Sequence, residues 1–204
     1  WIFSGGRAKG IELSCYPLVY PQCLRRKWIA LIGDRASGKS TISARVAQEL
    51  GLDSYDLDLV LAQRVGRDHH SFFRLYGETR FREQEELALW DLPRFSLVLA
   101  TGGGVCSNPL AMKVLSERAQ FLYLDVCKSE LLRRRLSKPD SRPILEGFSS
   151  VEEEVSALYI NRREQYRQRS DWTVSWQGED VEGMVRKVLR ILTSGEESLL
   201  AGSA

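Results

Sequence analysis

The sequence predicts an α/β fold in which helices cover a parallel β-sheet. From residue 28 onward, short apolar runs alternate with segments of helical periodicity, the order expected when each strand is followed by a helix. The strand-sized runs are apolar at nearly every position, which is typical of strands buried on both faces. No break in composition divides residues 28–194, so we expect them to form one domain.

Five segments of the chain are predicted to be strands. Four of them, at 28–32, 96–100, 121–126 and 172–176, carry the apolar runs, and a shorter strand is expected to end near Leu57. These runs are short for helices, which usually need about ten residues or more.

A helix is expected after each of these strands. In 180–193 one helical face is formed by Val181, Met184, Val185, Val188, Leu189 and Leu192. A second apolar stripe, in 151–169, consists of Val151, Val155, Leu158 and Tyr166. Between Pro139 and Gly147 two prolines and a glycine occur without any period, so this stretch is predicted to be a loop.

The composition argues against several classes of function. The chain has 204 residues, 43% of them hydrophobic, and no apolar run approaches the roughly 20 residues of a membrane helix. Its net charge of +2 is too small to indicate a nucleic-acid or membrane-surface partner. The four cysteines form no C-x-x-C pair and lie far from both histidines, which argues against a zinc site. A disulfide between Cys15 and Cys23 is conceivable, but four thiols in a chain of this length suit a reducing compartment equally well, and the cytoplasm is the default expectation.

The strongest motif lies directly after the first predicted strand. Residues 33–40, Gly-Asp-Arg-Ala-Ser-Gly-Lys-Ser, match the pattern G-x-x-x-x-G-K-[ST] between a strand and a helix. The backbone N–H groups of such a loop point at phosphate oxygens, Lys39 reaches the outer phosphates, and the Ser40 hydroxyl can ligate magnesium. The alternative is a strand-to-helix turn that binds nothing.

Two carboxylates follow the first helix. Asp56 and Asp58 are two residues apart at the end of a predicted strand, and on an extended backbone both side chains project from one face. At the carboxyl edge of a parallel sheet, one could hold magnesium and the other a substrate hydroxyl. The alternative is that either aspartate caps the next helix.

Three consecutive glycines, Gly102, Gly103 and Gly104, follow the strand that ends at Ala100. A run without Cβ atoms lets a ligand approach the main chain, whereas a plain turn needs only one or two glycines. Ligand contact is therefore the favoured interpretation of this run, and a turn is the alternative.

Several arginines stand at positions where an anion could meet them. Arg162 lies near the middle of the apolar stripe, where a charge is costly unless it is paired, while Arg163 is expected to be solvated. Arg82 could grip a substrate carboxylate with support from Glu85, or form a surface ion pair. Arg142, in the predicted loop, could act on a transferring phosphate as part of a lid or be a solvated charge.

Taken together, these motifs resemble those of shikimate kinase over residues 28 to about 192. In chain order they are the P-loop at 33–40, Asp-x-Asp at 56–58, G-E-x-x-F-R-x-x-E at 77–85, Gly-Gly-Gly at 102–104, Arg-Pro-Ile-Leu at 142–145, and Arg162 with Tyr166. Six motifs in the expected order are far more specific than any one of them.

The resemblance implies ATP-dependent phosphorylation of the 3-hydroxyl of shikimate, a step of aromatic amino-acid biosynthesis, with Mg²⁺ as cofactor. It also implies a nucleoside-monophosphate-kinase-like P-loop fold with three α/β/α layers. The sheet of that fold has five parallel strands in the order 2-3-1-4-5, and a helical substrate-binding segment and a lid at about 138–150 accompany it. ATP and shikimate are then the partners, and we expect a monomer.

The resemblance further implies roles for individual residues. The implied ATP-binding residues are Gly33, Asp34, Arg35, Ala36, Ser37, Gly38, Lys39, Ser40, Thr41, Arg135 and Arg142, with Arg133 or Arg134 as alternatives to Arg135 beside adenine. The implied shikimate-binding residues are Asp58, Arg82, Glu85, Gly102, Gly103, Gly104 and Arg162. Ser40 and Asp56 are implied to hold the metal, and Lys39, Asp58 and Arg142 to be catalytic.

The chain departs from the family pattern at three places. The family usually has glycine where Ala36 stands, so we expect the loop to avoid a backbone conformation that only glycine tolerates. The segment between Arg162 and Tyr166 lacks the usual proline and leucine. Residues 1–27 have no counterpart in the single-domain bacterial enzymes, which leaves room for a plastid or fused origin, and residues 195–204 are expected to be a flexible tail.

Two other functions compete with this interpretation. Gluconate kinase and other small P-loop kinases share the fold and the first motif, but a clamp of Arg82 and Arg162 suits the shikimate carboxylate better. A non-catalytic relative could retain the pocket as a ligand-binding or regulatory module, although Lys39, Asp58 and Arg142 are all kept here.

Overall fold

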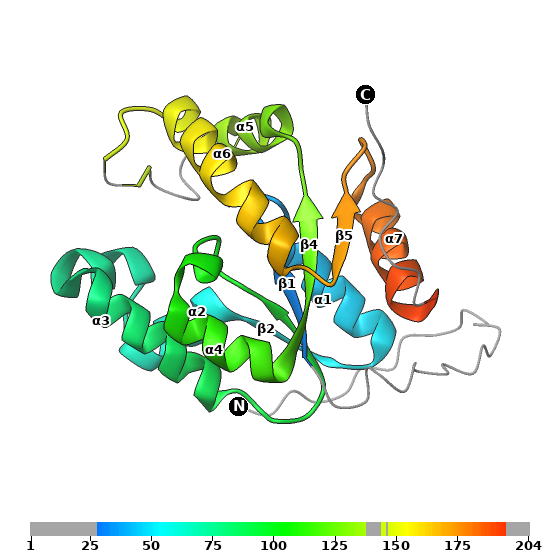
Figure 1. The fold of residues 1–204 in the computed structure, drawn as a ribbon, viewed down its shortest axis with the longest axis horizontal. Coiled ribbons are helices and arrows are strands. Elements are labelled where there is room, and N and C mark those ends of the chain that lie inside the picture. The colour runs from blue at the N-terminus through cyan, green and yellow to red at the C-terminus, as the bar shows by residue number, and fades with distance from the viewer. Residues whose placement is uncertain (1–27, 138–143, 146, 195–204) are drawn as a thin grey trace, which may run out of the picture.

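A computed structural model describes residues 28–137, 144–145 and 147–194. Its centre is a five-stranded parallel sheet in the order β2-β3-β1-β4-β5, as predicted (Figure 1). The strands are β1 (Trp28–Ile32), β2 (Asp53–Asp56), β3 (Leu97–Ala100), β4 (Ala119–Asp125) and β5 (Trp172–Ser175). Residues 1–27 and 195–204 and much of the expected lid, with Arg142, lie outside the described residues.

The strand bounds follow the pairing between neighbours. All five predicted strands are confirmed, but β4 begins two residues before the expected 121 because Ala119 pairs with Trp28 at the start of β1. Polarity alone misses this start, since Gln120 interrupts the apolar run while its backbone still pairs with Ile29.

Helices cover both faces of the sheet. They are α1 (Lys39–Leu50), α2 (Leu57–Val65), α3 (His69–Asp91), α4 (Pro109–Arg118), α5 (Lys128–Ser137), α6 (Val151–Arg169) and α7 (Val181–Ser194), with a short 3₁₀ helix, η2 (Val105–Ser107). Alternate residues of β1 face the two layers. Ile29 and Leu31 pack with α1 and α7, whereas Trp28, Ala30 and Ile32 pack with α2, α3 and α4.

Helix α3 consists of two parts joined at Gly77. Its first part begins after Asp68, whose carboxylate accepts a hydrogen bond from the Ser71 amide. Gly77 has φ 76° and ψ 177°, which interrupts the helical geometry. Only glycine adopts this backbone conformation without strain, so Gly77 sets the direction of the second part, which carries Arg82 and Glu85.

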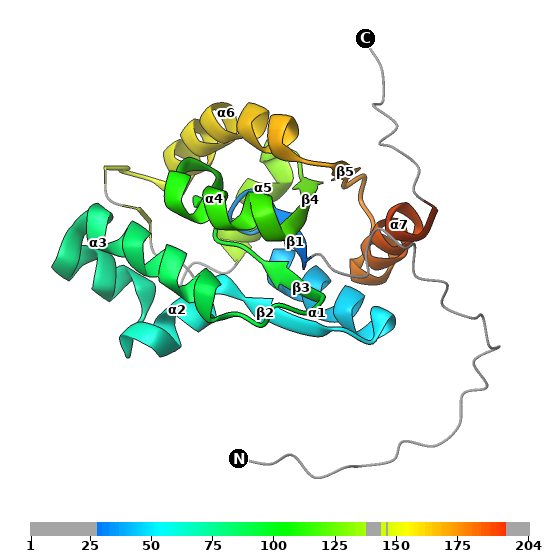
Figure 2. The ribbon, with the colours of Figure 1, turned by 60° about the horizontal axis from the view of Figure 1, so that its bottom comes forward.

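The carboxyl ends of β1, β2 and β3 meet at one edge of the sheet. The P-loop follows β1, Asp56 ends β2, and the glycine run follows β3. Thr101 ties the first and third of these together, because both its amide and its hydroxyl donate to the Leu31 carbonyl, at 3.2 and 2.8 Å. Helix α6 lies alongside α5 and near η2, which brings a fourth element to this edge (Figure 2). In the described part of the chain, no helix has the length and apolar character needed to cross a membrane.

Candidate active site

The P-loop connects β1 to α1 in a backbone conformation built on left-handed residues. Gly33 has φ 144° and Gly38 has φ 101°, and Gly38 stands at the N-cap of α1 without a side-chain cap. The first amides of α1 therefore point away from the helix at the end where its dipole is positive. This is the arrangement that a phosphate group requires.

Lys39 lies over this loop. Its ammonium donates to the carbonyls of Gly33 and Asp34, both at 2.7 Å, and its side chain is largely buried. Burial raises the pKa of the neighbouring Asp34 carboxyl, and the charges of Lys39 and Arg162 oppose that rise. The positive charge of Lys39 is thus held inside the loop, where phosphate oxygens would come.

Ala36 does not avoid the left-handed region, contrary to the expectation from the sequence. Its φ is 64°, and no other non-glycine residue in the described ranges has a positive φ. A Cβ in this region costs about 1–2 kcal/mol, which glycine does not incur. The P-loop therefore keeps its conformation with a strained residue where the family usually has glycine.

Asp56 and Asp58 do not share one extended strand, which corrects the predicted geometry. Strand β2 ends at Asp56, and Asp58 lies in the first turn of α2. The Asp56 carboxylate accepts a hydrogen bond from the Asp58 amide at 3.0 Å, so the alternative of a helix cap is confirmed for Asp56. Because the helix turns the chain, the Asp58 carboxylate faces the glycine run.

The three glycines admit charged side chains close to the backbone. A Cβ on Gly102 would stand 3.0 Å from an Asp58 carboxylate oxygen, and a Cβ on Gly103 would stand 3.2 Å from Cγ of Arg35. A Cβ on Gly104 would lie 3.5 Å from both Nη atoms of Arg82. The run is therefore more than a turn, because each position is approached by a side chain from another element.

Arg82 and Arg162 converge on Gly104 from two different helices. Nη2 of Arg162 would lie 3.7 Å from a Cβ at Gly104, close to the Arg82 guanidinium. Arg82 pairs with Glu85 at 2.7 Å, and Nη1 of Arg162 donates to the Gly103 carbonyl at 2.9 Å. Two guanidinium groups on one small patch of backbone could together bind a carboxylate.

Glu85 supports Arg82 from a buried position, and Asn108 supports Glu85. The exposed fraction of Glu85 is 3%, and burial raises the pKa of its carboxyl against the opposing charge of Arg82. The Asn108 amide donates to Glu85 at 2.9 Å while its oxygen caps α4. Sequence reasoning missed Asn108. The Asn-Pro pair at a helix start indicated only the cap, and the contact with Glu85 depends on how α3 packs.

Tyr166 fixes the glycine run from the opposite side. Its hydroxyl donates to the Gly103 carbonyl at 2.5 Å, so that carbonyl accepts bonds from both Tyr166 and Arg162. The Tyr166 ring is fully buried with its centroid 5.2 Å from that of Tyr123, and burial raises the pKa of its hydroxyl. The tyrosine of the Arg-x-x-x-Tyr motif therefore stabilises the backbone of the glycine run through this hydrogen bond.

Arg163 is not simply solvated, which corrects another expectation. Its guanidinium lies 3.1 Å from the Asp125 carboxylate at the end of β4, and Arg167 lies at the same distance from that oxygen. Asp125 is buried and also accepts a hydrogen bond from Tyr123. These ion pairs hold α6 against the sheet. The apolar periodicity of α6 could not predict them, because their partner, Asp125, is on β4.

The arginines of α5 have different surroundings. Arg135, the arginine expected beside adenine, is 2% exposed and pairs with Glu154 at 3.2 Å. Arg134 instead donates to the P-loop carbonyls of Ala36 and Ser37, at 3.3 and 3.0 Å, and its guanidinium lies 5.2 Å from the Trp176 ring centroid. Of the two alternatives named from the sequence, Arg134 is the one that touches the phosphate loop, while Arg133 pairs with Glu130.

A magnesium ion would find few protein ligands at this edge. No group of three His, Cys, Asp or Glu side chains able to hold a metal occurs among the residues that the structure describes. The Ser40 hydroxyl is exposed and Asp56 is partly exposed, and oxygen donors of this kind suit Mg²⁺. These residues fit an ion that takes most of its ligands from phosphate and water.

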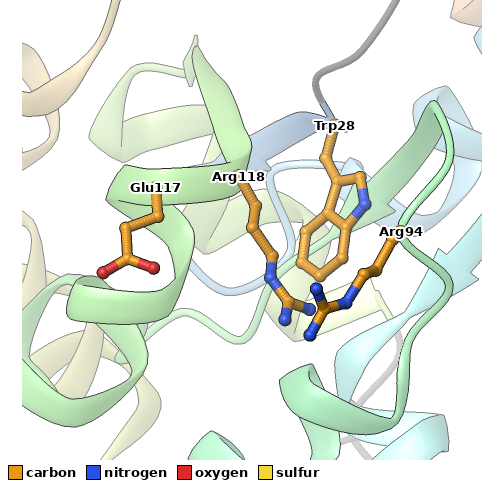
Figure 3. A pocket seen from close by; sticks show the side chains of 4 residues that line it. All are labelled: Trp28, Arg94, Glu117 and Arg118. Atoms are coloured by element: carbon orange, nitrogen blue, oxygen red, sulfur yellow. The ribbon is translucent and has the colours of Figure 1, made fainter.

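A separate cavity of about 200 Å³ lies away from these groups. Trp28, Arg94, Glu117 and Arg118 line it, and the Arg118 guanidinium lies 5.2 Å from the Trp28 ring centroid (Figure 3). Trp28 begins β1, whereas the P-loop follows the other end of that strand. The cavity therefore belongs to the opposite edge of the sheet from the candidate site.

Comparison with known proteins identifies the family. A family model described as shikimate kinase matches residues 35–193. The chain is 33% identical to a shikimate kinase of Enterococcus faecalis over 80% of this chain and 97% of the relative. It is 34% identical to one of Francisella tularensis subsp. novicida over 87% and 99% of the two chains.

Solved structures agree with this assignment. The shikimate kinase of Acinetobacter baumannii in complex with shikimate has a TM-score of 0.75 and 26% identity, covering 84% of this chain and 95% of that one. The enzyme from Bacteroides thetaiotaomicron has a TM-score of 0.73 and 25% identity, covering 81% and 98%. A matching family model over most of the chain, relatives aligned along nearly their full length, and the same fold lead to one conclusion: the chain belongs to the shikimate kinase family.

Proposed function

We propose that the protein transfers the γ-phosphoryl group of ATP to the 3-hydroxyl of shikimate, giving shikimate 3-phosphate and ADP. The observation that carries the proposal is the convergence of Arg82 and Arg162 on Gly104, beside the Asp58 carboxylate at Gly102 and next to a P-loop. A carboxylate clamp, a hydroxyl acceptor and a phosphate loop then lie at one sheet edge. Membership of the shikimate kinase family supports the same reaction.

ATP would bind along residues 33–41, with its phosphates on the loop amides and Lys39 near the outer phosphates. Loss of its contacts with the Gly33 and Asp34 carbonyls would free the Lys39 ammonium to neutralise charge on the moving phosphoryl group. Arg134, rather than Arg135, is the arginine that we place beside the nucleotide, because it already contacts the loop. Arg142, outside the described residues, remains the candidate for a second cation on that phosphoryl group.

Shikimate would bind over the glycine run. Arg82 and Arg162 would hold its carboxylate, with Glu85 fixing the Arg82 guanidinium, and amides of the glycine run would meet ring hydroxyls. Asp58 would accept a hydrogen bond from the 3-hydroxyl, orient it toward the phosphorus and receive its proton. In enzymatic phosphoryl transfer, positioning of the reactants and neutralisation of charge account for most of the rate enhancement.

Mg²⁺ is the proposed cofactor, held by the Ser40 hydroxyl and, through water, by Asp56. When bound, the ion would supply positive charge that neutralises part of the charge of the phosphate groups. The Asp56 carboxylate would keep its bond to the Asp58 amide, since one carboxylate oxygen remains for water. We further propose a cytoplasmic monomer.

A coupled assay of ADP release with ATP, Mg²⁺ and shikimate tests this function. The wild type should turn over shikimate, while Asp58→Asn should lower kcat by about 100-fold or more, because the amide cannot take the proton. Gluconate serves as a parallel acceptor. Turnover of gluconate alone, or full activity of Asp58→Asn, would contradict the proposal.

A further inference from the structure

Glu154, in the first turn of α6, is a fully buried carboxylate to which the proposed reaction gives no role. One of its oxygens accepts a hydrogen bond from Arg35 of the P-loop at 2.8 Å. The other accepts from Arg135 of α5 at 3.2 Å and from the Leu145 amide at 3.0 Å. Donors from three separate segments of the chain therefore end on one side chain.

Arg35 also lies beside the glycine run, over which shikimate is proposed to bind. The Arg35 side chain is 12% exposed, and its amide nitrogen and Cγ would lie 3.4 and 3.2 Å from a Cβ at Gly103. Gly103 in turn offers its carbonyl to Arg162 and Tyr166. A continuous series of contacts thus joins Glu154 to the phosphate loop and the glycine run.

We propose that Glu154 is a positioning residue that acts through Arg35 to hold the phosphate loop against the glycine run. It thereby sets where the γ-phosphate lies relative to the shikimate hydroxyl. This inference rests on the proposed function. Alignment matters in phosphoryl transfer, because a displacement of about 1 Å between reacting groups costs on the order of 100-fold in rate.

The chemistry of the contact explains why a carboxylate is needed at residue 154. Two oxygens with four lone-pair directions can serve Arg35, Arg135 and the Leu145 amide at once. A glutamine has one oxygen and brings an NH₂ group, which would face donors. Glu154→Gln keeps the size of the side chain while breaking part of this network.

The test compares Glu154→Gln, Arg35→Met and the double variant by steady-state kinetics and thermal unfolding. Glu152→Gln is the matched control, since Glu152 is exposed in the same helical turn. We expect Glu154→Gln to lower kcat about tenfold or more with a smaller effect on the KM for shikimate, because alignment rather than binding is lost. The loss of kcat in the double variant should be clearly smaller than the product of the two single losses, because both changes remove the Glu154–Arg35 interaction.

The outcomes separate this inference from a purely stabilising role and from the proposed function. A lowered Tm with kcat within twofold of the wild type, or losses that multiply in the double variant, would overturn the inference. If Glu154→Gln does not fold, Arg35→Met must still lower kcat, since it leaves Glu154 paired with Arg135. A wild type without shikimate turnover would overturn the proposed function and this inference together.

Discussion

At the scale of single residues, Ala36 is strained within a functional loop. Its φ of 64° belongs to a region that a glycine occupies freely. Ala36→Gly should therefore raise the free energy of unfolding by about 0.5–1 kcal/mol, since the relief of strain exceeds the entropy that glycine adds to the unfolded chain.

Urea unfolding measures this change. Ala44→Gly, at an exposed position inside α1, is the matched control and should lower the free energy of unfolding by about 1 kcal/mol. The same substitution is thus expected to have opposite signs at two nearby sites. Equal destabilisation by both would refute the account of Ala36.

Arg82 and Arg162 give a second prediction at this scale. If they hold the shikimate carboxylate, Arg162→Met should raise the KM for shikimate roughly 10–100-fold, because a charged hydrogen bond worth about 1.5–3 kcal/mol is lost. With the methyl ester of shikimate, which has no carboxylate charge, the same variant should differ little from the wild type.

The control is Arg80→Met, because Arg80 is 70% exposed and pairs only with Glu83 among the described residues. Its kinetics should match those of the wild type. An equal loss for shikimate and its ester in Arg162→Met would argue against the clamp.

The residue types at the site were predictable, but several of their partners were not. The resemblance to a known family, which rests on the order of the motifs, predicted one common site for Asp58, Arg82 and Arg162. The sequence could not place Asp58 on a helix, because an Asp-x-Asp pattern suits a strand end and a helix start equally well. Likewise the partner of Arg163, Asp125, is on β4, and such a pairing arises from packing rather than from local pattern.

At the scale of elements, α5 positions the arginine that touches the P-loop. Glu130 is 6% exposed and pairs with Arg133 and Arg134, and the hydrogen bond from Arg133 is the main cause that lowers the pKa of its carboxyl to about 2. Because the pKa of Glu130 is lower in the folded protein, its ionised carboxylate stabilises the fold at pH values above 4.5, the ordinary pKa of a glutamate. This stabilisation is lost as the pH falls toward 2.

Glu130→Gln should therefore lower the free energy of unfolding by about 1 kcal/mol at pH 7, a figure reduced for the solvent exposure of Arg133. The difference from the wild type should narrow below pH 4.5 and vanish near pH 2. Thermal unfolding across this range checks the prediction. A gap that is constant with pH would show that the ionised carboxylate is not its cause.

The elements themselves were largely predictable. The strands and the helix at 151–169 follow from apolar periodicity, which burial on two faces imposes. The interruption of α3 at Gly77 was not predictable, since a glycine at this position could equally precede a helix or lie at a bend within one. The position of Arg82 depends on this interruption, because Arg82 lies in the part of α3 that follows it.

At the scale of the whole molecule, parallel topology assembles the site. Because β1, β2 and β3 are adjacent and parallel, the segments after them meet at one edge although they are far apart in sequence. Helix α6 then adds Arg162 and Tyr166 from near the end of the chain. The convergence of these segments could be predicted only from the resemblance to a family. Apolar periodicity identifies the strands, but it does not show their order in the sheet.

The most direct test of the central claim is to identify the product by ³¹P NMR. The wild type is incubated with ATP and Mg²⁺ and with shikimate or gluconate in separate samples. We predict a new phosphomonoester only in the shikimate sample, with its phosphorus coupled to the proton on carbon 3, together with an equal amount of ADP. Phosphorylation of gluconate alone, attachment at another hydroxyl, or ADP with no phosphorylated acceptor would contradict the account.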